Sequence, residues 1–207
     1  MKKRLFLEII RQIAHILIGL AIILLILLSD RELTIIILFI LFCLSVLFSL
    51  SIIFFKRIAK FKPINFLLEN LGRDYDRKIF PAKGLVFFFA GCLLTIKLFD
   101  NNIALAAITI LAFGDSVSTL VGLFGKTRYN NGLMSRYKTL YGTLLGILVS
   151  FLVALLFVEP VYALIASLFG MISEAISIKL GESEADDNLI VPIIAGGAVY
   201  IAKIIGI

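Results

Sequence analysis

Two acidic residues lie inside apolar stretches of this sequence, where a carboxylate needs partners. Asp115 follows Gly114 within the apolar segment 103–124, about three helical turns from its end, and Glu174 lies inside segment 161–178. A charged side chain deep in a membrane span costs on the order of 2.5–3.5 kcal/mol, so such residues are functional candidates. Buried carboxylates of this kind can hold Mg²⁺, take a proton from a hydroxyl group or line a path for ions.

Three further ionisable residues share one face of the first apolar segment. Glu8, Arg11 and His15 are spaced by three and four residues, which stacks them on a helix. Glu8 and Arg11 can pair near the membrane boundary, either as a purely structural ion pair or as part of a site. His15 is the only histidine, so a histidine-based metal cluster is excluded.

A basic, glycine-containing stretch at 125–143 is suited to binding polyphosphate. Glycines such as Gly125 let backbone amides approach phosphate oxygens, while Lys126 and Lys138 can neutralise their charge. The stretch is not a P-loop, because Leu120 occupies the position of the first glycine.

Acidic residues gather again between the last two apolar segments. Among them, Asp187 adjoins Asn188 at the membrane edge, whereas Glu182 and Glu184 are expected to be solvated. Magnesium prefers one or two carboxylates together with phosphate oxygens and water. An acidic cluster on the same membrane face as the basic stretch therefore indicates Mg²⁺ bound between carboxylates and phosphates.

Membrane-spanning helices must position these side chains. Of the 207 residues, 61% are hydrophobic and 16% are charged, against about 45–50% and about 25% in a soluble domain. Seven apolar segments approach the length of about 20 residues that a span requires, with six or eight spans as alternatives. These segments are 13–28, 33–55, 85–99, 103–124, 140–158, 161–178 and 189–207. We expect an all-α, polytopic membrane protein with a single catalytic transmembrane domain over 1–207.

The basic residues predict how the chain crosses the membrane. The stretches before residue 12, at 56–83 and at 126–138, together with Lys179, hold 17 of the 20 lysines and arginines. Seven spans put these regions on one face, which the positive-inside rule makes cytoplasmic. The amino terminus is then cytoplasmic and the carboxyl terminus outside. This bias explains the net charge of +6 without nucleic-acid binding. Cys43 and Cys92 lie within spans and need no disulfide.

Several motifs together resemble the polyprenol kinase family, which includes dolichol kinases, phytol kinases and CTP-dependent diacylglycerol kinases. The family is distantly related to CDP-diacylglycerol synthases. The matching pieces follow the family's order along nearly the whole chain, although Tyr141 stands where members commonly carry glutamate. They are Glu8-x-x-Arg11-x-x-x-His15, Pro81-Ala82-Lys83-Gly84, Gly114-Asp115 through Gly122-x-x-Gly125-Lys126, Lys138-Thr139-x-x-Gly142-Thr143, Glu174 and Asp187-Asn188-x-x-x-Pro192.

The resemblance implies transfer of the γ-phosphoryl group of CTP to the hydroxyl of a lipid alcohol in the cell membrane, at a site facing the cytoplasm. The acceptor would be a polyprenol, dolichol or a related isoprenoid or glycerolipid alcohol. The implied roles are Mg²⁺ binding by Asp115 and Asp187, phosphate binding by Lys83, Lys126 and Lys138, and shaping of the nucleotide pocket by Gly122, Gly125, Thr139, Gly142 and Asn188. Either Glu174 or Asp115 would orient or deprotonate the hydroxyl, and Lys138 would act beside them.

Two other functions fit parts of the same sequence. A cytidylyltransferase forming a CDP-lipid also needs CTP, Mg²⁺, carboxylates and basic residues, and differs in its product. A small ion-coupled transporter would use Asp115, Glu174 and His15 as an ion path. The absence of a convincing internal repeat disfavours the transporter.

Overall fold

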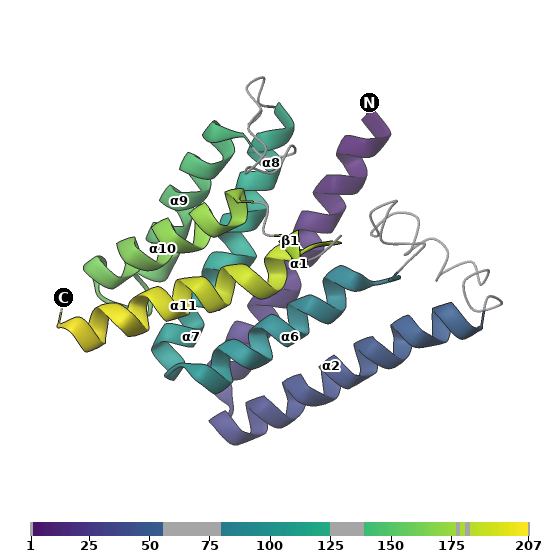
Figure 1. Cartoon of the computed structure of the whole chain (residues 1–207), viewed down its shortest axis with the longest axis horizontal. Helices are drawn as coiled ribbons and strands as arrows, with labels where there is room; N and C mark the ends of the chain where they lie inside the picture. The colour runs from purple at the N-terminus through teal and green to yellow at the C-terminus, as the bar shows by residue number, and fades with distance from the viewer. Residues whose placement is uncertain (1, 56–79, 125–138, 177–178, 181–182, 207) are drawn as a thin grey trace.

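Helices account for nearly all of the secondary structure, because backbone groups in long apolar segments must be satisfied within the segment. The computed structural model describes residues 2–55, 80–124, 139–176, 179–180 and 183–206. Its helices in chain order (Figure 1) are α1 Lys2–Leu28, α2 Arg31–Phe54, α6 Lys83–Leu98, α7 Asn101–Thr109, the π-helix η1 Ile110–Asp115, α8 Ser116–Phe124, α9 Leu140–Ala154, α10 Pro160–Ala175 and α11 Asp187–Ile205. The expected all-α class is confirmed.

The central element is one continuous rod made of α7, η1 and α8. Most of its residues are buried, including Ala104, Ile108 and Leu111. Helix α1 packs along the rod, α9 and α10 cover it from another direction, and α11 lies between α10 and α6. Helix α2 lies outermost and packs mainly against α6 (Figure 1).

Small residues allow the rod to approach its neighbours closely. A Cβ atom on Gly19 of α1 would lie 2.4 Å from Cβ of Ala112, and one on Gly142 of α9 would lie 2.5 Å from the carbonyl oxygen of Ser118. Backbones are therefore in near contact where α1 and α9 meet the rod.

Within the described part of the chain, four helical stretches are long and apolar enough to span a membrane: Leu5–Leu28, Arg31–Phe54, Asn101–Phe124 and Asp187–Ile205. Helices α9 and α10 are apolar but shorter. Large hydrophobic side chains such as Leu17, Phe39 and Leu152 are exposed on the outside of the bundle. This surface is what a lipid environment would cover.

Two boundaries differ from the expectation. Helix α10 ends at Ala175, before the apolar segment does, and a short antiparallel pair follows it, β1 Lys179–Leu180 with β2 Ser183–Glu184. Helix α11 begins at Asp187, before the apolar segment 189–207, because the side chain of Asp186 accepts a hydrogen bond from Asn188 N and caps the helix.

The helices have two distinct ends, which the polar contacts identify. At the end called here the polar end, the first half of α1 meets η1 and α8, α8 meets the last turn of α10, and the starts of α6 and α11 meet each other. At the opposite end, the start of α2 contacts the α6–α7 corner through Arg31. The predicted site residues that the structure describes lie toward the polar end.

Candidate functional site

A π-helical turn presents Asp115 to α1. The turn η1 ends at Asp115, whose carboxylate is buried, with 8% of the residue exposed. His15 Nε2 lies 3.2 Å from the carbonyl oxygen of Leu111 in this turn and 4.0 Å from Asp115 Oδ2. Because both oxygens are acceptors, Nε2 carries the proton and donates to Leu111. Such π-turns are frequent at functional sites.

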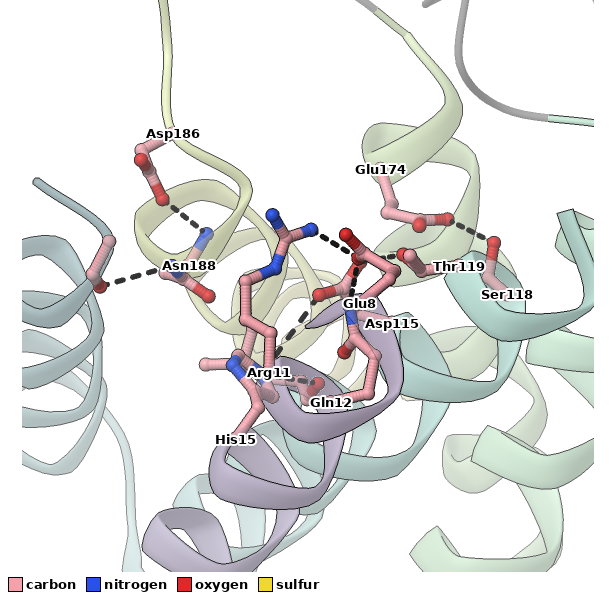
Figure 2. Close-up of polar contacts among 12 residues, drawn as sticks. Glu8, Arg11, Gln12, His15, Asp115, Ser118, Thr119, Glu174, Asp186 and Asn188 are labelled. Atoms are coloured by element: carbon pink, nitrogen blue, oxygen red, sulfur yellow. Dashed lines mark hydrogen bonds and ion pairs between the residues drawn. The ribbon is translucent and has the colours of Figure 1, made fainter. Parts of the chain in front are cut away.

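A hydrogen-bonded network on α1 faces this turn. The Glu8 carboxylate accepts from the guanidinium of Arg11 and from Gln12 Nε2, the latter at 3.0 Å. The predicted Glu8–Arg11 ion pair is therefore confirmed. Figure 2 shows the side chains of Glu8 and Asp115 converging from their two helices, with Arg11 beside them. Thr119 Oγ1, one turn after Asp115, donates to Asp115 Oδ1 at 3.4 Å.

The second predicted carboxylate, Glu174, lies at the neighbouring contact of α8 with α10. Only 1% of Glu174 is exposed, and its Oε2 accepts from Ser118 Oγ at 3.0 Å. Ser118 and Thr119 are adjacent on α8, so the two carboxylate sites share this helix but belong to different helix contacts. A polar group so deeply buried requires such hydrogen bonding.

Thr139, Gly142 and Gly122 also meet at the α8–α9 contact. Thr139 is buried, and its hydroxyl caps α9 by accepting from Gly142 N at 3.1 Å. A Cβ atom on Gly142 would lie 3.3 Å from Gly122 N. The structure brings these three residues together and gives each a packing role.

The starts of α6 and α11 form the other side of the polar end. Asn188 Nδ2 donates to the carbonyl oxygen of Gly84 at 3.1 Å. Figure 2 shows Asp186 and Asn188 across from Arg11. Asn188 therefore joins two helix starts beside the α1 network.

Lys83 begins α6 after a strained residue. Ala82 has φ 60°, a left-handed conformation that is uncommon for residues other than glycine. Ser49 of α2 donates to the carbonyl oxygen of the preceding Pro81 at 2.6 Å and helps to hold this conformation. The ammonium group of Lys83 lies 5.8 Å from the ring centroid of Phe87.

The predicted residues thus fall into three groups. The first group brings together Glu8, Arg11, His15 and Asp115. The second group lies around α8 and consists of Glu174, Gly122, Thr139 and Gly142. The third group lies at the starts of α11 and α6 and consists of Asn188 and Lys83. Asp187 is half-buried in the first turn of α11. Gly125, Lys126 and Lys138 lie outside the described residues.

Sequence reasoning missed Gln12 and the capping role of Asp186. Gln12 lies one turn after Glu8 and one turn before His15, so the polar stripe of α1 contained a fourth member. That spacing was the signal. Asp186 precedes the apolar periodicity of the last helix, as N-cap residues do.

The carboxylates of the described residues fit Mg²⁺ only if a bound substrate supplies further oxygen ligands. No group of three or more His, Cys, Asp or Glu residues in this part of the chain could hold a metal ion. Magnesium bound by one or two carboxylates takes its remaining ligands from phosphates and water. Asp115 and Asp187 could serve in this way only with a phosphate-bearing substrate.

Comparison with known proteins identifies no matching family model, no similar curated protein and no similar solved structure.

Proposed function

We propose that this chain is a CTP-dependent lipid-alcohol kinase resembling the polyprenol kinases. The observation that carries the proposal is the convergence of Asp115, on a π-turn, with the Glu8–Arg11 pair and His15 inside otherwise apolar helices. Phosphoryl transfer depends mainly on positioning and charge neutralisation. A polar cluster of this kind at one end of an apolar bundle suits an enzyme that takes one substrate from water and one from lipid.

The proposed topology has seven spans, with the amino terminus in the cytoplasm and the carboxyl terminus outside. Two observations support it. The polar contacts distinguish the two ends of the bundle, and 17 of the 20 lysines and arginines fall in the four sequence regions that seven spans put on one membrane face. The site then faces the cytoplasm, where CTP is available. The protein is accordingly proposed to lie in the cell membrane.

In the proposed reaction, the hydroxyl oxygen of the lipid alcohol attacks the γ-phosphorus of CTP. The bond from this phosphorus to the bridging oxygen breaks, and CDP leaves. The hydroxyl proton passes to a carboxylate, either Asp115 or Glu174, and the products are a lipid monophosphate and CDP. Asp115 borders the α1 network and is the more exposed of the two, while Glu174 is held by Ser118.

Further residues have proposed roles around this reaction. Lys83, Lys126 and Lys138 would neutralise phosphate oxygens, and Gly122, Gly125, Thr139, Gly142 and Asn188 would shape the nucleotide pocket. Mg²⁺ bound by Asp115 and Asp187 would supply further neutralisation of the triphosphate. Glu8, Arg11 and His15 hold the surroundings of Asp115 in place.

The test is a transfer assay with purified protein in nanodiscs, γ-labelled CTP, Mg²⁺ and a panel of lipid alcohols. Label should appear in a lipid monophosphate, and Asp115→Asn should lower turnover by about 10²–10³-fold, the effect of losing one preorganised electrostatic group. Thr109→Val, a buried change on the same rod, is the matched control.

Other outcomes identify the alternatives. Label released as pyrophosphate, with a CDP-lipid formed, would establish a cytidylyltransferase. No turnover and no CTP binding, together with ion-coupled uptake into sealed vesicles, would establish the transporter.

A further inference from the structure

Gln12 combines deep burial with a fixed amide orientation. Only 3% of the residue is exposed, and Nε2 donates to Glu8 Oε1 at 3.0 Å. A carboxylate paired with Arg11 can accept but cannot donate, so the nitrogen of the amide must face Glu8. The amide oxygen therefore points away from Glu8 by chemical necessity.

That oxygen, Gln12 Oε1, is a buried acceptor without a hydrogen-bond partner among the described residues. Leaving such an acceptor unsatisfied costs about 1–3 kcal/mol, and orphan groups of this kind are rare in native structures. This unfavourable free energy indicates that a hydrogen-bond donor binds to Gln12 Oε1.

The surroundings of Gln12 favour a ligand as that donor. The nearby carboxylates of Glu8 and Asp115 are acceptors, His15 Nε2 is directed to Leu111, and Thr119 Oγ1 is directed to Asp115. Figure 2 shows the Gln12 amide within the same cluster as Asp115 and His15. A hydroxyl group bound there would reach an acceptor that no described side chain occupies.

We propose that Gln12 Oε1 accepts a hydrogen bond from the hydroxyl of the lipid alcohol and so places that hydroxyl beside Asp115. The inference rests on the proposed function and assigns its acceptor subsite. A neutral amide oxygen suits an O–H donor, whereas the oxygens of a phosphate are themselves acceptors and would not bind it.

The position of Gln12 on α1 suits a ligand that arrives from the bilayer. Gln12 is seven residues from the start of the candidate span Leu5–Leu28, which is about 10 Å along a helix. The next residues on the outer face, Ile13 and Leu17, are 51% and 60% exposed. An apolar tail can lie against this face while its hydroxyl end reaches the inner, polar face.

The experiment compares alcohols with their methyl ethers, which cannot donate a hydrogen bond. Binding of geranylgeraniol and of a diacylglycerol, each with its methyl ether, is measured by competition in nanodiscs with the wild-type protein and Gln12→Met. The wild type should bind at least one alcohol about tenfold more tightly than its ether, the effect of one hydrogen bond. In Gln12→Met the ratio of the dissociation constants of the ether and the alcohol should fall to near one, because the variant lacks the acceptor oxygen. Comparing both proteins with both ligands forms a double-mutant cycle, which isolates the contribution of this hydrogen bond.

Two controls keep the result specific. Thr95→Val removes a buried hydroxyl of α6 that donates only within its helix, to Gly91, and should leave the preference intact. Thermal unfolding of Gln12→Met should show a protein as stable as the wild type within a few degrees, because the substitution also removes the orphan oxygen.

The outcomes separate this inference from the proposed function. A preference that is absent in the wild type, or that persists in Gln12→Met, overturns the acceptor subsite and leaves a buried water as the partner of Gln12 Oε1. If the wild type still transfers label from CTP in that case, the inference alone has failed. If no alcohol receives label, the proposed function has failed, and a preference lost in Gln12→Met would still identify a hydroxyl-binding site.

Discussion

The two ends of the bundle each hold a half-buried arginine, and the partners of the two guanidinium groups differ. At the opposite end, Arg31 donates to Asn101 Oδ1 and to the carbonyl oxygen of Phe99, both at 2.9 Å, and also to the carbonyl oxygen of Ile96. Carbonyls at a helix C-terminus lack intrahelical partners and carry partial negative charge. Arg31 therefore satisfies the end of α6 and ties it to α2 and α7.

At the polar end, Arg11 pairs with a carboxylate instead. Its partner Glu8 also accepts from Gln12, and a second carboxylate, that of Asp115, lies 4.0 Å from His15. Carboxylates that converge in an apolar interior repel one another unless cations hold them. The comparison teaches that the partners of an arginine, rather than its burial, separate a structural role from a role in a site.

Exchanging each arginine for methionine should separate these roles most strongly. Arg31→Met should lower the free energy of unfolding by roughly 3 kcal/mol, because several hydrogen bonds to a charged donor are lost, and turnover per folded molecule should be unchanged. Arg11→Met should lower turnover by more than about tenfold, because Glu8 loses the cation that pairs with it, with a smaller loss of stability. Thermal unfolding and the CTP transfer assay measure both quantities.

Methionine preserves much of the apolar stem of arginine, so the pair is matched for packing. Equal losses of stability and of turnover in the two variants would contradict the comparison.

Gly114→Ala should disturb the polar end through its packing. The new Cβ would lie 2.0 Å from Ser150 Oγ and 2.7 Å from Met171 Sδ, and such overpacking costs about 1–3 kcal/mol. Gly197→Ala is the matched control, because the nearest atom to its Cβ is 3.9 Å away. The double variant Gly114→Ala/Ser150→Ala should recover part of the loss in thermal stability. No recovery would show that Ser150 is not the obstruction.

Asp186→Ala should have the smallest effect. The substitution removes the cap of α11, a loss of about 1 kcal/mol, and Asp186→Ser should restore stability because serine caps equally well. If Asp186 acts on the polar end only as a cap, Asp186→Ser should also restore turnover. Restored stability without restored turnover would assign its charge to the site.

The helices and the candidate carboxylates were predictable from the sequence for local reasons. Long apolar segments must form helices, and each of the seven segments contains one in the structure. Asp115 and Glu174 stood out because charge inside such segments is costly. The Glu8–Arg11 pair followed from helical spacing alone.

Other features depended on contacts between segments far apart in the chain. The carbonyl oxygen of Leu111 meets His15 across 96 residues, and Ser118 meets Glu174 across 56. Arg31 lies outside the basic regions that the sequence predicts to be cytoplasmic, and its contacts with the end of α6 depend on the position of the α6–α7 corner.

By itself the sequence determined that the chain folds as apolar helices and which charged residues they bury, because backbone satisfaction and helical periodicity act over a few residues. Only the tertiary structure decided that Asp115 sits on a π-turn against α1 and that Glu174 belongs to a separate helix contact. It also decided that Gln12 carries an acceptor with no partner among the described residues. Whether a buried polar atom finds a partner depends on which helices pack together, and that is a property of the whole bundle.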